Sequence, residues 1–115
     1  MPDNGKWKLT GFIEALHTLK ETQPTWAALG HIRAALDRWA DRCAHDPYLG
    51  AYREPGFDNL WHTAVPGTLH DGHKICCVYW IWETTRTVKV DMMQPLRLPI
   101  ASAPLDDGEA EAELA

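Results

Sequence analysis

The sequence predicts an α+β fold in which an N-terminal helical hairpin packs on a small antiparallel β-sheet. The chain has 115 residues, and a single domain typically holds about 100–150. Apolar residues recur at helical spacing up to Cys43, and beyond Leu60 the pattern becomes extended over three short segments. The elements therefore run helix, helix, strand, strand, strand, an order typical of helices covering one face of a meander.

The first predicted helix carries apolar residues at three- to four-residue steps: Phe12, Ile13, Leu16 and Leu19. Thr10 can cap its start through its hydroxyl. We expect the helix to end near Thr22, because Pro24 disfavours helical geometry at the residue before it.

The second predicted helix has the clearest apolar stripe: Leu29, Ile32, Leu36, Trp39 and Cys43. Thr25 can cap its start, and the helix should stop before Asp46. Its opposite face carries charged residues, which we interpret as a solvated surface: Arg33, Asp37, Arg38, Asp41 and Arg42.

The predicted strands follow a loop of turn-forming residues over 47–56. Leu60–Val65 is the first strand, and Lys74–Trp82 is a continuous apolar run that predicts a central strand covered on both faces. Glu83–Arg86 can form a tight hairpin turn into a strand over Arg86–Met93. That last strand alternates, with three apolar residues on one face: Val88, Val90 and Met92.

Charge and composition favour one cytosolic domain over residues 1–98, followed by a proline-spaced linker and acidic tail over 99–115. The formal net charge is −5, but residues 106–115 contain five acids and no base, so the chain before them is formally neutral. We expect this tail to be disordered. No apolar run is long enough to span a membrane, and no secretory signal is visible. The three cysteines are interpreted as buried reduced thiols of a cytosolic protein.

Several local strings resemble the RelE/ParE family of toxin-antitoxin toxins over about residues 30–93. Residues 32–40, followed by Asp-Pro-Tyr-Leu-Gly at 46–50, are similar to that family's second helix and the turn after it. Residues 59–65 (Asn-Leu-Trp-His-Thr-Ala-Val), 74–81 and 86–90 resemble its successive strands. Two features depart from the family: the first strand is represented only by Trp-Lys-Leu at 7–9, and no tyrosine or histidine follows Arg97.

The resemblance implies a toxin that cleaves messenger RNA on the ribosome without a metal or other cofactor. In such ribonucleases the 2′-hydroxyl attacks the adjacent phosphate, so cations and a proton-transfer group are needed. By position, the implied catalytic residues are Lys74, Arg53, Arg97 and His62, and the implied RNA-binding residues are Trp61 and His73. The implied partners are a cognate antitoxin protein, messenger RNA and the ribosome, with no membrane.

Two other functions stay open. The chain can be a non-enzymatic protein of the same fold, either a gyrase poison or a protein-interaction module. Alternatively, it can be a small metal- or ligand-binding domain, because nitrogen and sulfur donors are close in the sequence: His62, His70, His73, Cys76 and Cys77. Adjacent cysteines diverge across a strand and zinc sites need paired ligands at regular spacing, so we assign no metal ligands.

The tryptophans and thiols also have structural interpretations. Trp80 and Trp82 share one face of the central strand, and Trp61 lies in its predicted neighbour. They can form a platform that stacks RNA bases, or a packed core and antitoxin-binding surface. All three cysteines, Cys43, Cys76 and Cys77, lie in apolar contexts that raise the pKa of a thiol, which argues against a cysteine nucleophile.

Overall fold

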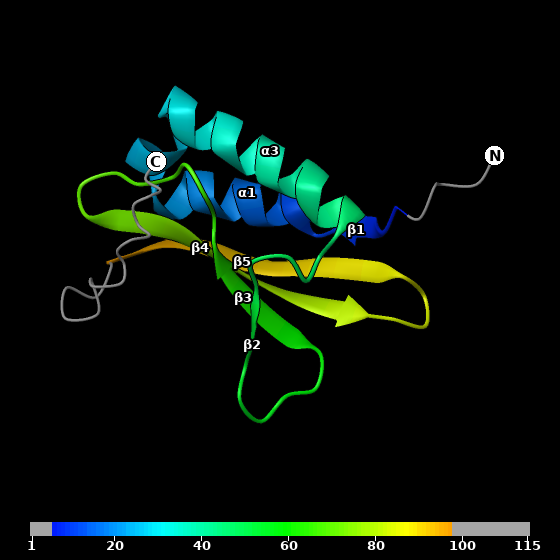
Figure 1. Cartoon of the computed structure of the whole chain (residues 1–115). Coiled ribbons are helices and arrows are strands. Elements are labelled where there is room, and N and C mark those ends of the chain that lie inside the picture. Colours follow the sequence, from blue (N-terminus) through cyan, green and yellow to red (C-terminus); the bar gives the residue numbers. More distant parts are fainter. Residues whose placement is uncertain (1–5, 98–115) are drawn as a thin grey trace.

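A single five-stranded sheet forms one layer of the protein (Figure 1). The computed structural model describes residues 6–97. The strands lie in the order β1-β5-β4-β3-β2, which places β4 and β5 in the interior of the sheet. Their bounds are β1 Lys8–Thr10, β2 Tyr52–Arg53, β3 Leu60–Ala64, β4 His73–Trp82 and β5 Thr87–Arg97. The expected acidic tail lies outside the described residues.

Helices form the second layer and cover one face of this sheet (Figure 1). Their bounds are α1 Phe12–Thr22, α2 Pro24–Ala27 and α3 Gly30–His45. The predicted α+β class, the order of the main elements and the helical hairpin are confirmed. None of the described helices is both long enough and apolar enough to cross a membrane.

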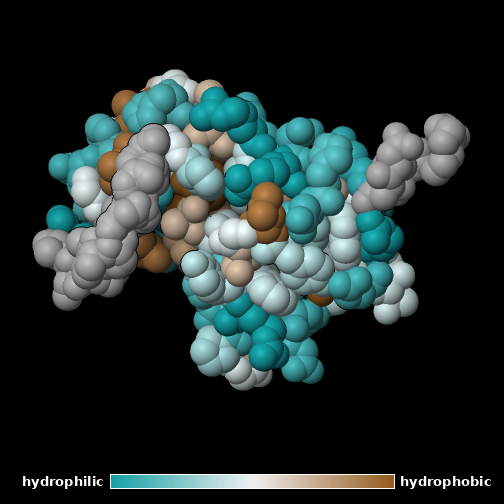
Figure 2. Space-filling model, viewed as in Figure 1, coloured by the Kyte–Doolittle hydropathy of each residue, from teal (hydrophilic) through white to brown (hydrophobic). Residues whose placement is uncertain are grey.

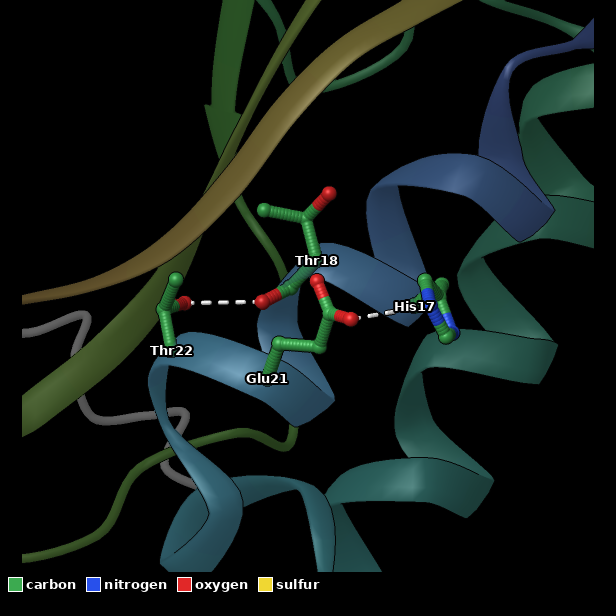
Figure 3. A network of polar contacts seen from close by, with 4 residues as sticks. All are labelled: His17, Thr18, Glu21 and Thr22. Carbon is green, nitrogen blue, oxygen red and sulfur yellow. Dashed lines mark hydrogen bonds and ion pairs between the residues drawn. The ribbon is translucent and has the colours of Figure 1, made fainter.

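The core lies between the helices and the sheet, where the stripe predicted for the second helix is buried. Within α3, Ile32, Leu36, Trp39 and Cys43 are all buried, and the charged residues on its other side are exposed. On α1 the outer face is polar, with an ion pair of 3.2 Å between His17 and Glu21 (Figure 3). Ile13, predicted to face the core, is instead 67% exposed.

Both predicted threonine caps are wrong. Thr10 belongs to β1, where its hydroxyl donates a hydrogen bond to the Val88 carbonyl. Gly11 precedes α1 with a φ of 78°, a left-handed conformation that glycine adopts without steric cost. Thr25 lies inside the short α2, since Pro24 is well placed in a first helical turn, and α3 begins separately at Gly30.

The sheet is mixed, which corrects the purely antiparallel prediction. β1 pairs in parallel with the start of β5, with Leu9 opposite Val88. The expected loop over 47–56 contains β2, a two-residue strand that pairs antiparallel with β3. Both additions are short edge strands, and pairs of two or three residues leave no periodicity in a sequence.

The central strand is not covered on both faces as predicted. Burial alternates along β4: Ile75, Cys77, Tyr79 and Ile81 are buried under the helices, whereas the residues between them are less buried and Trp82 is 40% exposed. Because successive strand residues point to opposite faces, the second face of the sheet is accessible over β4. The prediction failed because tryptophan, cysteine and valine side chains make the second face of β4 apolar although no helix covers it.

A β-bulge in β5 overturns the predicted face of Met92, whereas Val88 and Val90 are buried on one face as predicted. Val78 of β4 is opposite Met92, but Tyr79 is opposite Val90, so Asp91 is an extra residue. Met93 therefore takes the buried position after Val90, and Met92 is exposed. β5 also continues past its predicted end to Arg97. Pro95 lies in this extension, beyond the residues that pair with β1, so β5 is an edge strand there and tolerates a residue without an N–H.

Tyr79 links the sheet to the turn after α3. Its buried hydroxyl donates a hydrogen bond of 2.9 Å to the Pro47 carbonyl, and burial raises the pKa of Tyr79 far above its usual range. The hydroxyl is therefore neutral and donates at physiological pH.

Tyr79→Phe should lower the free energy of unfolding by about 1–2 kcal/mol, because the buried Pro47 carbonyl loses its donor. Urea denaturation followed by circular dichroism measures this change. Tyr52→Phe is the matched control, since Tyr52 is 69% exposed, and should change stability by less than about 0.5 kcal/mol. Equal effects of the two substitutions would contradict a role for the Tyr79 hydroxyl.

Candidate functional site

The face of the sheet opposite the helices, called the open face below, carries the candidate site. Strand register and alternation place on it these residues: Tyr52, Leu60, His62, Ala64, Lys74, Cys76, Val78, Trp80, Trp82, Thr87, Lys89, Met92, Gln94 and Leu96. No described helix lies over this face in Figure 1. The loop between β2 and β3 protrudes beside it and is hydrophilic (Figure 2).

Aromatic rings form a row on the open face. Trp80 and Trp82 have parallel rings with centroids 6.4 Å apart. Phe57, from the loop between β2 and β3, contacts Trp80 edge-on at 5.9 Å, and Tyr52 lies 5.8 Å from the His62 ring. Such partly exposed rings provide flat surfaces on which nucleic-acid bases stack without sequence preference.

His62 lies in the middle of β3, next to the edge strand β2, and its ring is close to a carboxylate. Its Nδ1 atom lies 2.5 Å from Oε2 of Glu54, and both side chains are about one third exposed. Nδ1 itself is buried and, within residues 6–97, has no hydrogen bond of acceptable geometry, so its contact with the Glu54 carboxylate is one of distance alone. A carboxylate this close to Nδ1 favours a proton on that nitrogen, which leaves Nε2 for proton transfer with a substrate.

The predicted site residues lie in several separate places. Lys74 and His62 lie on the open face, about 13 Å apart along the strand direction. Trp61, in contrast, points under the helices, where its ring contacts Tyr48 at 5.1 Å. The Arg53 guanidinium contacts the β2–β3 loop. Its Nη1 donates a hydrogen bond of 3.3 Å to the Phe57 carbonyl and lies 3.7 Å from the Asp58 carboxylate.

His73 and Arg97 are opposite each other at the end of the sheet where β4 begins. In the alternation of the two strands, both residues fall on the helix-covered side of the sheet. The His73 ring lies against Trp26 of α2. The structure therefore does not bring all six predicted residues into one cluster. It brings His62 together with Glu54, and it places Lys74 on the same face as Lys89, Trp80 and Trp82.

Sequence reasoning missed Glu54 as the partner of His62. The two residues are eight positions apart, and they meet because Tyr52 pairs with His62 across the β2–β3 hairpin. A two-residue strand gives no alternation from which this register could be derived. Lys89 had a usable signal, since it alternates with Val88 and Val90 and so had to face away from the core.

The thiols do not supply a nucleophile at this site. Burial raises the pKa of Cys43 to about 12 and that of Cys77 well above its usual value. Cys76, on the open face, has a pKa raised by burial and by the nearby Glu54 carboxylate. Among residues 6–97, no three histidine, cysteine or acidic side chains are arranged to hold a metal ion.

Comparison with solved structures relates this geometry to a known fold. The chain superposes on the free state of the E. coli toxin RelE, an arginine-to-alanine double mutant, with a TM-score of 0.53. The superposition covers 93% of this chain and 94% of that chain. The chain has a RelE-like fold. Sequence identity is 15%, so the likeness is one of architecture.

At the level of sequence, no protein-family model and no curated protein matches the chain. The RelE-like fold confirms the architecture that the resemblance implied for the helices and sheet. A fold shared at 15% sequence identity does not by itself assign an activity to the open face.

Proposed function

We propose that this RelE-like chain is the toxin of a toxin-antitoxin system and cleaves messenger RNA on its open face without a metal. The observation that carries the proposal is the uncovered face of the sheet, where a histidine close to a carboxylate shares the face with two parallel indoles and two lysines. The RelE-like fold supports the toxin assignment. A ribosomal substrate would place the protein in the cytoplasm, and a cognate antitoxin would hold it inactive.

The residues of the open face suit cleavage by the RNA's own 2′-hydroxyl. His62 would accept the hydroxyl proton at Nε2 while the 2′ oxygen forms a bond to phosphorus and the bond to the 5′ oxygen breaks. The products are a 2′,3′-cyclic phosphate and a 5′-hydroxyl end, which takes its proton from solvent. Lys74 and Lys89 would attract the phosphates, and the indoles would hold the bases.

Induced expression tests the toxin proposal directly. We expect growth arrest in a bacterial host, with messages cut inside their coding regions and carrying 5′-hydroxyl ends in primer-extension assays. Co-expression of the protein encoded beside this gene should restore growth. Normal growth with intact messages would contradict the proposal.

The second candidate function is a non-enzymatic toxin or interaction module with the same fold. It is favoured by the small number of cations on the described part of the open face, which carries Lys74 and Lys89 but no arginine. Growth arrest with intact messages and damaged DNA would support a gyrase poison and contradict RNA cleavage.

Trp82→Ala should weaken binding of a single-stranded RNA by about 5- to 150-fold, because one stacked base contributes about 1–3 kcal/mol. Fluorescence anisotropy with a labelled uridine decamer measures the change at fixed salt. Ile13→Ala is the matched control, since Ile13 is an exposed apolar residue on α1, in the helix layer. An equal loss in both variants would show that the indole row is not the RNA-binding surface.

A further inference from the structure

Two indoles of β4 stand parallel at the end of the open face where β4 turns into β5. The ring planes of Trp80 and Trp82 differ by 7°, and their centroids lie 6.4 Å apart. Neighbouring bases in a nucleic-acid stack lie about 3.4 Å apart, so one base between two rings needs about 6.8 Å between their planes. The indoles fall slightly short of this separation, and a small rotation of one ring admits a single planar base. Trp80 and Trp82 are called the indole slot below.

One wall of the indole slot is braced, and the other is exposed. Phe57 packs edge-on against Trp80 at 5.9 Å, and Arg53 donates a hydrogen bond of 3.3 Å to the Phe57 carbonyl. Trp82, in contrast, is the last residue of β4 and is 40% exposed. Its ring can therefore rotate with little loss of packing, while Trp80 stays in place. Opening the slot by a few tenths of an ångström needs no change in the sheet.

The β5 side of the indole slot carries a cation. Lys89 is opposite Trp80 in the register of β4 and β5, and its exposed side chain shares the open face with both indoles. Thr87, opposite Trp82, is uncharged. An ammonium group binds a phosphate oxygen through charge-assisted hydrogen bonds. A nucleotide whose base enters the slot therefore meets a partner for its phosphate on this side.

The β3 side of the indole slot carries a carboxylate. The Asn59 carbonyl accepts a hydrogen bond of 2.9 Å from the Ile81 N–H, which places the end of the β2–β3 loop beside β4. The preceding residue, Asp58, is fully exposed, and it lines a hollow of about 630 Å³ together with Asn59 and Trp82. An ionised carboxylate only accepts hydrogen bonds, so it suits a base whose edge carries an amino group.

We propose that the indole slot sandwiches one purine base of a nucleotide, with the phosphate on Lys89 and the amino-bearing edge of the base toward Asp58. A purine is favoured because its two rings overlap more of each indole than a pyrimidine does, and stacking strength sets base preference at such sites. Adenine and guanine carry amino groups, whereas uracil carries none.

The inference rests on the proposed function only in naming the source of the base, an RNA strand on the open face. His62 is opposite Val78, three residues along β4 from the middle of the slot, which is about 10 Å at the rise of a strand. A purine held at that distance would select which phosphate of the RNA lies at His62. The slot would then position the message as well as bind it.

Titration of the full chain with AMP, GMP and UMP tests the slot without requiring any RNA cleavage. In NMR spectra, we expect the base protons of AMP and GMP to shift upfield on binding, because a sandwiched base lies against two aromatic faces. The indole N–H signals of Trp80 and Trp82 should shift saturably, whereas that of Trp39, buried under α3, should not. UMP should bind at least about fivefold more weakly than AMP. Equal affinities for AMP and UMP would overturn the proposal.

Substitutions at Trp82 test the sandwich itself. Trp82→Ala removes one wall and should weaken AMP binding by about 5- to 150-fold. Trp82→Phe keeps a flat ring and should restore most of the affinity, while Ile13→Ala on the helix layer should bind as the wild type does. A phenylalanine that binds AMP no better than alanine would show that the base does not stack on this residue.

Substitutions on the two sides of the slot test the orientation of the nucleotide. Lys89→Gln should weaken binding of AMP but not of adenosine, which has no phosphate. Asp58→Asn should weaken binding of GMP by about 2- to 10-fold and leave UMP unchanged. Equal losses for AMP and adenosine, or for GMP and UMP, would overturn the orientation across β4.

His62→Ala separates this site from RNA cleavage. The variant should bind AMP with wild-type affinity, because His62 lies outside the slot. Binding of purine nucleotides by a chain that leaves messages intact would contradict the proposed function and support the slot. Cleavage of messages by a chain that binds no purine nucleotide would do the reverse.

Discussion

Replacing Gly11 with alanine should lower the free energy of unfolding by about 2–5 kcal/mol. Gly11 has a φ of 78°, and a Cβ at this position would lie 2.4 Å from the Val90 carbonyl oxygen, closer than real contacts allow. The left-handed conformation costs an alanine about 1–2 kcal/mol, and the backbone overlap adds about 1–3 kcal/mol. The overlap would push α1 away from β5, against which it packs.

Gly50→Ala is the matched control for this effect. Gly50 has a similar φ of 72°, but nothing lies within 4 Å of the point where its Cβ would stand. It should therefore cost only the conformational part, about 1–2 kcal/mol. Urea denaturation of both variants gives the two values. A Gly11→Ala variant no less stable than Gly50→Ala would show that α1 and β5 are not held at this close approach.

The elements that the sequence predicts well are those whose pattern is long. In α3, four apolar residues repeat at helical spacing over three turns, and all of them are buried. In contrast, β1 and β2 are too short to show a period, and they form only because β5 and β3 offer partners elsewhere in the sequence. Pairing of that kind depends on the folded sheet.

Neighbouring residues of a strand point to opposite faces, so an error of one position in the register puts a side chain on the wrong face. This limited how well the site could be predicted from the sequence. Trp61 and His62 are neighbours, yet Trp61 packs under the helices and His62 faces outward. The bulge at Asp91 reverses the faces of Met92 and Met93 in the same way. No local signal marks the bulge, because an extra residue is visible only against the partner strand.

His62→Ala should reduce the rate of message cleavage by about 10²–10⁴-fold, the range that a positioned proton-transfer group contributes. This result depends on the proposed function, in which Nε2 accepts the 2′-hydroxyl proton. The assay is single-turnover cleavage of a defined message on programmed ribosomes, followed by primer extension. His17→Ala is the matched control, because His17 is also paired with a glutamate, on α1 away from the open face (Figure 3), and should cleave at the wild-type rate.

Glu54→Gln separates positioning from chemistry in the same assay. Glutamine can still contact Nδ1 but carries no charge to stabilise the imidazolium that forms during proton transfer. The variant should therefore lower the maximal single-turnover rate, by less than His62→Ala does, and leave the half-saturating concentration unchanged, because Glu54 acts through His62. A higher half-saturating concentration with the wild-type maximal rate would assign Glu54 to RNA binding. Wild-type cleavage by His62→Ala would exclude the open-face histidine as the base and favour a non-enzymatic role for this RelE-like fold.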